Sequence, residues 1–153
     1  MALIFPSHSA VPAFSELIRG FAYQHEGAYD FSTQQSVIWT DPDADLTLVH
    51  ADELGYRAIG LHGAELVMMS GMSWEEVTQA PKDSSLYFWD LPLFQDTTYV
   101  IQTVERHYAK FRVLVMLDGY FEYAYQSDGS RVLEETVPTT EATWGVIKAM
   151  YSN

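Results

Sequence analysis

Residues 98–134, TYVIQTVERHYAKFRVLVMLDGYFEYAYQSDGSRVLE, contain the pattern that decides the fold. From residue 109 to residue 117, every second position is apolar, which is the period of a strand with one buried face. Asp118-Gly119 and Asp128-Gly129 each follow such a run, and Asp-Gly is typical of the tight turn of a β-hairpin. This stretch therefore predicts an antiparallel meander of three or four strands.

In the third strand of that meander, Phe121, Tyr123 and Tyr125 share one face, while Glu122 and Gln126 share the other. Working outward, short strands are also expected within residues 29–32, 36–39, 46–50 and 64–69. The expected fold class is therefore mainly β, either all-β or α+β.

Three short peripheral helices are expected around this core. Apolar residues spaced by 3, 4 and 3 predict a helix over residues 11–24. Ser73-Trp74-Glu75-Glu76 has the pattern of a capping box, which predicts a short helix ending near Gln79. A third helix is expected within residues 140–152. We thus expect one β-rich domain over residues 1–153, with a helical extension at 1–27, a β core at 28–134 and a helical tail at 135–153.

The charge excludes some partners. The chain has 21 acidic and 8 basic residues, so its net charge is −13. Nucleic-acid binding depends on clustered Lys and Arg, so a nucleic-acid partner is not expected.

No apolar run reaches the ~18 residues of a membrane span, so membrane insertion is not expected either. The N-terminal residues lack the pattern of a signal peptide. The location therefore stays open: cytoplasmic, or extracellular if the chain is a mature form.

Patterns that indicate catalysis are absent from the sequence. It has no cysteine, no G-x-S-x-G elbow and no glycine-rich phosphate loop. Asp41-Pro42-Asp43-Ala44-Asp45 begins like a calcium loop, but Leu46 stands where the turn requires Gly, so a solvated acidic turn is favoured. We therefore expect a protein that is not an enzyme and has no cofactor.

A haem site is the alternative to having no cofactor. His50 and His62 lie near Met68, Met69 and Met72 in the sequence, and imidazole and thioether groups both ligate haem iron. These five residues are the candidates for cofactor binding. The other interpretation, which the pattern favours, is that the methionines fill the core and the histidines are ordinary polar groups.

Two side-chain clusters are candidates for partner binding. Tyr87, Phe88, Trp89 and Phe94 lie in the densest aromatic segment, and aromatic side chains are common anchors at interfaces. The alternative is that they belong to the core. Lys110 and Arg112 share a strand face and form a candidate basic patch. Glu122 on the next strand is expected to neutralise it.

Several short motifs resemble the HmuY-like family of β-rich bacterial surface proteins, whose best-known members are haem-binding lipoproteins. The similar stretches are residues 98–103 (TYVIQT), 108–113 (YAKFRV), 121–126 (FEYAYQ), 29–33 (YDFST) and 63–81, so the resemblance spans about residues 28–133. It implies a β-rich fold. Residues 82–96 are much shorter than the family's ligand-bearing segments, so the resemblance assigns a haem ligand to no position here.

Three functions remain as hypotheses. The first is a non-enzymatic binding or assembly module that acts through protein–protein contacts, with a protein partner or by self-association. The second is a haem or tetrapyrrole carrier, by resemblance to the HmuY-like family. The third is an acidic inhibitor or immunity-type partner of a basic protein, because opposite charge accelerates association.

Overall fold

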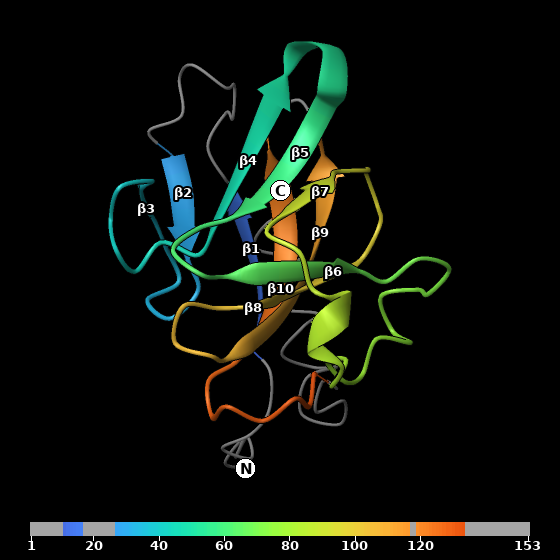
Figure 1. The fold of residues 1–153 in the computed structure, drawn as a ribbon. Helices are drawn as coiled ribbons and strands as arrows, with labels where there is room; N and C mark the ends of the chain where they lie inside the picture. Colours follow the sequence, from blue (N-terminus) through green and yellow to red (C-terminus); the bar gives the residue numbers. More distant parts are fainter. Residues whose placement is uncertain (1–10, 17–26, 117–118, 134–153) are drawn as a thin grey trace, which may run out of the picture.

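The computed structural model describes residues 11–16, 27–116 and 119–133, which form two five-stranded antiparallel sheets packed face to face (Figure 1). The strands are β1 Val11–Glu16, β2 Gly27–Asp30, β3 Gln35–Ile38, β4 Leu46–Ala51, β5 Gly55–Gly60, β6 Glu65–Met68, β7 Asp90–Pro92, β8 Tyr99–Gln102, β9 Tyr108–Val115 and β10 Tyr120–Gln126. Two 3-10 turns, η1 Asp52–Leu54 and η2 Ser84–Leu86, complete the described elements. The expected β-rich, antiparallel class is confirmed.

The first sheet has the strand order β1-β10-β9-β8-β6. Its centre is the predicted meander β8–β9–β10, in which Tyr123 lies opposite Phe111 and Tyr125 lies opposite Ala109. Local alternation sets this register, because slipping by one residue would turn every buried side chain outward.

The second sheet has the strand order β3-β2-β4-β5-β7. The β4–β5 hairpin projects at the top of Figure 1. Two strands of the second sheet, β5 and β7, were not predicted. β5 lies between Gly55 and Gly60, and β7 ends at Pro92. Glycine and proline disfavour strands in a sequence pattern, although proline is tolerated on an edge strand such as β7.

The helix predicted over residues 11–24 is wrong where it can be checked. Residues 11–16 form strand β1, which pairs with β10 from Val11 opposite Tyr125 to Glu16 opposite Tyr120. The reason lies in the tertiary structure. Pairing with β1 satisfies the backbone groups along one side of the long strand β10. The spacing of apolar residues within 11–24 carries no information about this distant partner. Residues 17–24, and the helix expected within 140–152, lie outside the described part of the chain.

The helix predicted to start at Ser73 is also wrong. The reciprocal capping hydrogen bonds do form, because the Ser73 amide donates to Glu76 Oε1 and the Glu76 amide donates to Ser73 Oγ. The chain then makes only a turn, since the Thr78 amide donates to the Glu76 carbonyl. The Trp74 carbonyl, which a helix would use for Thr78, instead accepts from Lys110 Nζ.

In the described residues, no helix has the length and apolar character needed to cross a membrane.

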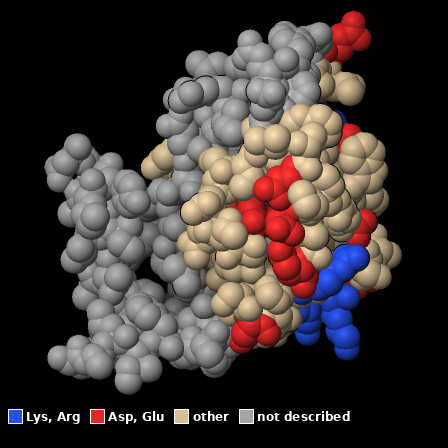
Figure 2. Space-filling model, turned by 90° about the vertical axis from the view of Figure 1, so that its left-hand side faces the viewer, with Lys and Arg blue, Asp and Glu red and all other residues tan. Residues whose placement is uncertain are grey.

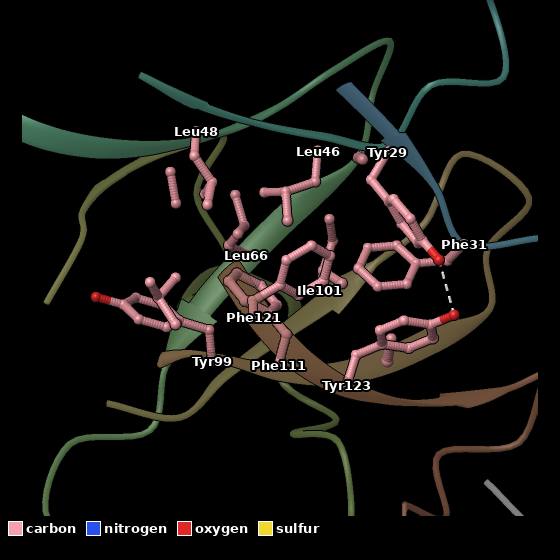
Figure 3. Close-up of a cluster of buried hydrophobic side chains, with 14 of the residues drawn as sticks. Tyr29, Phe31, Leu46, Leu48, Leu66, Tyr99, Ile101, Phe111, Phe121 and Tyr123 are labelled. Atoms are coloured by element: carbon pink, nitrogen blue, oxygen red, sulfur yellow. Dashed lines mark hydrogen bonds between the residues drawn. The ribbon is translucent and has the colours of Figure 1, made fainter. Parts of the chain in front are cut away.

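The main core lies between the two sheets and is rich in aromatic rings (Figure 3). Tyr29 contacts Phe121 edge-on, with ring centroids 5.3 Å apart. The hydroxyl groups of Tyr29 and Tyr123 are hydrogen-bonded at 2.8 Å, and Tyr123 also donates to Gln34 Oε1. These contacts join β2 of one sheet to β10 of the other, and they satisfy hydroxyl groups that would be costly to bury alone.

A second, smaller core covers the outer face of the first sheet. It contains Val67, Val77, Ala80, Tyr87, Val100 and Leu133. Beside it, Lys110 is buried and donates to the carbonyls of Trp74 and Val77, with its Nζ 4.3 Å from the centre of the Trp74 ring. Arg112 forms an ion pair with Glu122 on β10, as expected, and its guanidinium carbon lies 5.2 Å from the centre of the same Trp74 ring, so both basic side chains contact the covering segment.

Candidate interaction surface

The aromatic segment that follows η2 crosses from one sheet to the other. Its first anchor is Tyr87, which is buried in the second core and donates its hydroxyl to the Pro81 carbonyl at 2.8 Å. Burial raises the pKa of the Tyr87 hydroxyl, so this side chain stays neutral. Of the four predicted partner-binding residues, Tyr87 is therefore a structural anchor with little exposed surface.

Phe88 and Trp89 are held by backbone hydrogen bonds to both sheets. Phe88 exchanges two bonds of 2.7 Å with Leu66 on β6, and the Trp89 carbonyl accepts from the Gly60 amide on β5 at 2.7 Å. β7 follows directly and pairs with β5, where Asp90 accepts from Arg57 at 2.9 Å. The backbone at these two residues is therefore fixed, as it is in a strand.

The side chains of Phe88 and Trp89 nevertheless face the surface. Phe88 is 53% exposed and Trp89 is 63% exposed. We call these two residues the aromatic edge. Phe94 is 54% exposed as well; its amide donates to the Tyr99 hydroxyl, which in turn donates to the Pro92 carbonyl. Single exposed apolar residues are common on proteins, but large adjacent aromatic ones on a fixed backbone are typical of binding surfaces.

The two histidines predicted for haem ligation lie far apart. His50 is on β4 with its ring 4.7 Å from that of Tyr56, near one end of the β4–β5 hairpin. His62 lies beyond the other end of β5, where its Nε2 is 3.0 Å from the Trp39 carbonyl. Residues 56–60 of the intervening strand span about 13 Å.

The three methionines are close together in the chain, but their side chains have different surroundings. Met68 packs against the main core, Met69 packs against the second core and Met72 is 40% exposed. The structure therefore does not gather the five haem candidates around one cavity.

Sequence reasoning missed the most unusual carboxylate. Asp45, assigned above to a solvated turn, is fully buried. Its Oδ2 accepts from the Phe31 amide at 2.8 Å and its Oδ1 accepts from the Val104 amide at 2.7 Å. Phe31 follows β2 and Val104 follows β8, so one carboxyl group joins the two sheets. No local pattern points to this role, because Val104 is 59 residues away.

Asp45 lies in an acidic cluster with Asp30 and Glu105, whose ligand-type atoms are all within 4.8 Å of one another. Burial raises the pKa of Asp45 to about 7; the two amide donors oppose this shift, and the charges of Glu105 and Asp30 add to it. Burial and the same three carboxyl groups raise the pKa of the Tyr125 hydroxyl to about 12.

Such a cluster has the chemistry of a cation site, but its two buried members, Asp30 and Asp45, already accept hydrogen bonds from the protein. Asp30 accepts from the Ser32 amide and hydroxyl and from the Thr33 hydroxyl. Asp45 accepts from two amides. These contacts make Asp30 the cap of the turn after β2, and Asp45 a link between the two sheets.

Comparisons with known proteins assign no family. No protein-family model matches the chain, and no curated protein matches it in sequence. The resemblance to the HmuY-like family therefore stays a prediction.

Proposed function

We propose that this protein is a non-enzymatic binding module that acts through protein–protein contacts. The observation that carries the proposal is the aromatic edge: Phe88 and Trp89 expose more than half of their surface on a backbone bonded to both sheets. Aromatic side chains supply most of the affinity at many interfaces, and a rigid backbone lowers the entropy lost on binding.

The test compares two variants of the full chain. F88A/W89A removes the aromatic edge and leaves its backbone hydrogen bonds possible. The control is L54A, because Leu54 is 69% exposed and lies in η1 before β5, whereas Trp89 is bonded to Gly60 at the other end of that strand. Each immobilised protein is exposed to an extract of the cells that encode it, and captured proteins are identified and titrated. Thermal unfolding confirms that both variants fold.

We expect a partner that binds the unmodified protein and L54A with equal affinity, and binds F88A/W89A at least 30-fold more weakly. The factor follows from two anchors that contribute about 1 kcal/mol or more each. A partner that binds all three proteins equally would refute the role of the aromatic edge. The absence of any partner, together with a monomeric protein at all concentrations, would refute the proposed function.

A further inference from the structure

Strand β3 is an open edge of the second sheet. Among the described strands it pairs only with β2, from Gln35 opposite Asp30 to Ile38 opposite Gly27. In an antiparallel edge strand, alternate residues point their amide and carbonyl groups away from the sheet, which makes the edge a template for another strand. Gln35, Ser36 and Ile38 are exposed and Val37 is half-buried.

Two other sheet edges are blocked. β6 is covered at Leu66 by the two backbone hydrogen bonds to Phe88. β7 is only three residues long and ends in Pro92, whose nitrogen cannot donate. Short strands and proline are the usual means by which proteins protect an edge. β3 is also short, with four residues, but it contains no proline and no other described strand covers its outer side, so it is less protected than β6 and β7.

The sequence around β3 is also unprotected. Residues 31–40, FSTQQSVIWT, contain no charged residue, although the chain has 21 acidic ones and Asp30 and Asp41 flank the stretch. Ile38 is 57% exposed and Trp39 is 41% exposed. A segment of high strand propensity without charge, proline or glycine is the kind that pairs with its own copy.

The charge distribution indicates which partner fits this edge. Two copies that each carry −13 repel, so they can meet closely only where acidic side chains are absent. Figure 2 shows the side of the molecule on which β3 lies in Figure 1; it carries a streak of acidic side chains, several separate acidic patches and a basic cluster, and uncharged side chains cover most of the rest of the described surface. A basic partner would gain nothing from an uncharged edge.

We propose that β3 pairs with β3 of a second copy of this chain. The pairing is antiparallel and two-fold symmetric, with Val37 opposite Val37 and Ser36 opposite Ile38 of the other copy, because Gln35 and Val37 direct their backbone groups to β2 and Ser36 and Ile38 direct theirs outward. It joins the two second sheets into one continuous sheet. This inference rests on the proposed function, since it names self-association as one form of contact. So short a pairing buries far less than the ~1,600 Å² of a standard interface, so the dimer is weak and forms at high protein concentration.

The test is sedimentation equilibrium of the full chain from 10 µM to 1 mM, at 20 mM and at 500 mM NaCl. Salt screens the repulsion between two acidic copies, so we expect dimerisation to be at least 10-fold stronger at 500 mM. I38K should weaken the dimer at least 10-fold, because it places a charge in the paired strand. The control T40K changes the net charge equally at an exposed residue outside β3, and should leave the dimer unchanged.

A distance measurement fixes the register independently. The chain contains no cysteine, so T40C can be spin-labelled at one site. In the proposed register the two Thr40 positions are separated along the strands by about 20 Å, from ~3.3 Å per residue over six residues. Pulsed electron resonance should give a distance of that order at 500 mM NaCl and 1 mM protein.

The experiments distinguish failure of β3 pairing from failure of the proposed function. A monomer at 1 mM in 500 mM NaCl, or a dimer that I38K leaves intact, would overturn β3 pairing. A dimer that F88A/W89A abolishes and I38K does not would place self-association at the aromatic edge, so the proposed function would survive without this inference. A foreign strand whose binding is weakened by both I38K and salt would show that β3 takes a basic partner instead.

Discussion

Replacing Asp45 with asparagine should change how the stability of this protein depends on pH. Asp45 is fully buried, and burial raises its pKa from the ordinary 3.8 to about 7. In the unfolded chain the group ionises near its ordinary pKa, while in the folded chain it keeps its proton until about pH 7. The unfolded state is therefore progressively favoured as pH rises from about 4 to about 7, and the full penalty remains above that range.

The magnitude follows from the size of the shift. A shift of about 3 pKa units at 1.36 kcal/mol each makes the full penalty on the folded state about 4 kcal/mol. Between pH 5 and pH 8 the free energy of unfolding should fall by about 2.5 kcal/mol through this group alone. D45N cannot titrate, so it escapes this fall. It also turns an amide NH₂ toward one of the two backbone donors, which costs about 1–3 kcal/mol at every pH.

Urea unfolding at pH 5, 6, 7 and 8 gives the free energy of unfolding of D45N and of the unmodified protein. The difference between the two values isolates Asp45, because the histidines and the other acidic residues are the same in both proteins. The control is D43N, which alters an exposed aspartate of the same loop and should give a difference that is flat with pH. A D45N difference that stays constant within about 0.5 kcal/mol over this range would refute the argument, since 2.5 kcal/mol is expected.

Further predictions concern the packing and the cofactor. W74A should lower the free energy of unfolding by about 3–5 kcal/mol, because it opens a cavity beside Lys110 and removes a ring 4.3 Å from its charge. G60A should destabilise by at least ~3 kcal/mol in the same urea assay, since an added Cβ would lie 2.0 Å from the Ala64 carbonyl oxygen. Y123F should cost about 1–2 kcal/mol by removing the bonds to Tyr29 and Gln34. Equimolar haemin should give no saturable Soret shift in absorbance, because the five candidate ligands do not converge; a shift lost on replacing His50 would contradict this expectation.

The meander β8–β9–β10 could be predicted because its signals are local. Alternation decides which face of a strand is buried, and the Asp-Gly steps mark where the chain reverses. The same logic failed at β1, where the spacing of four apolar residues favoured a helix. A strand on the edge of a sheet is stabilised by backbone bonds to its neighbour, here β10, and those bonds leave no periodicity in the edge strand itself.

The exposed aromatic residues could be predicted only in part. Tyr87, Phe88 and Trp89 are consecutive, and alternation indicates that some are buried and some exposed without deciding which. The choice depends on two distant groups: the Pro81 carbonyl accepts the Tyr87 hydroxyl, and Leu66 fixes the backbone of Phe88. Tyr87 turns inward and Phe88 turns outward, as expected for successive residues of an extended chain, but Trp89 is exposed as well, so alternation alone does not explain the segment.

The buried charges show why the remaining features escape sequence analysis. Asp45 and Lys110 belong to residue types that are almost never fully buried unless paired, so each was assigned to the surface or to a patch. Both are buried because backbone groups meet them: two amides at Asp45 and two carbonyls at Lys110. Each thereby holds a turn or covering segment against a sheet, and such partners become neighbours only after the sheets have formed. The open edge at β3 depends on the same kind of global arrangement, since its exposure is decided by which strands find partners elsewhere.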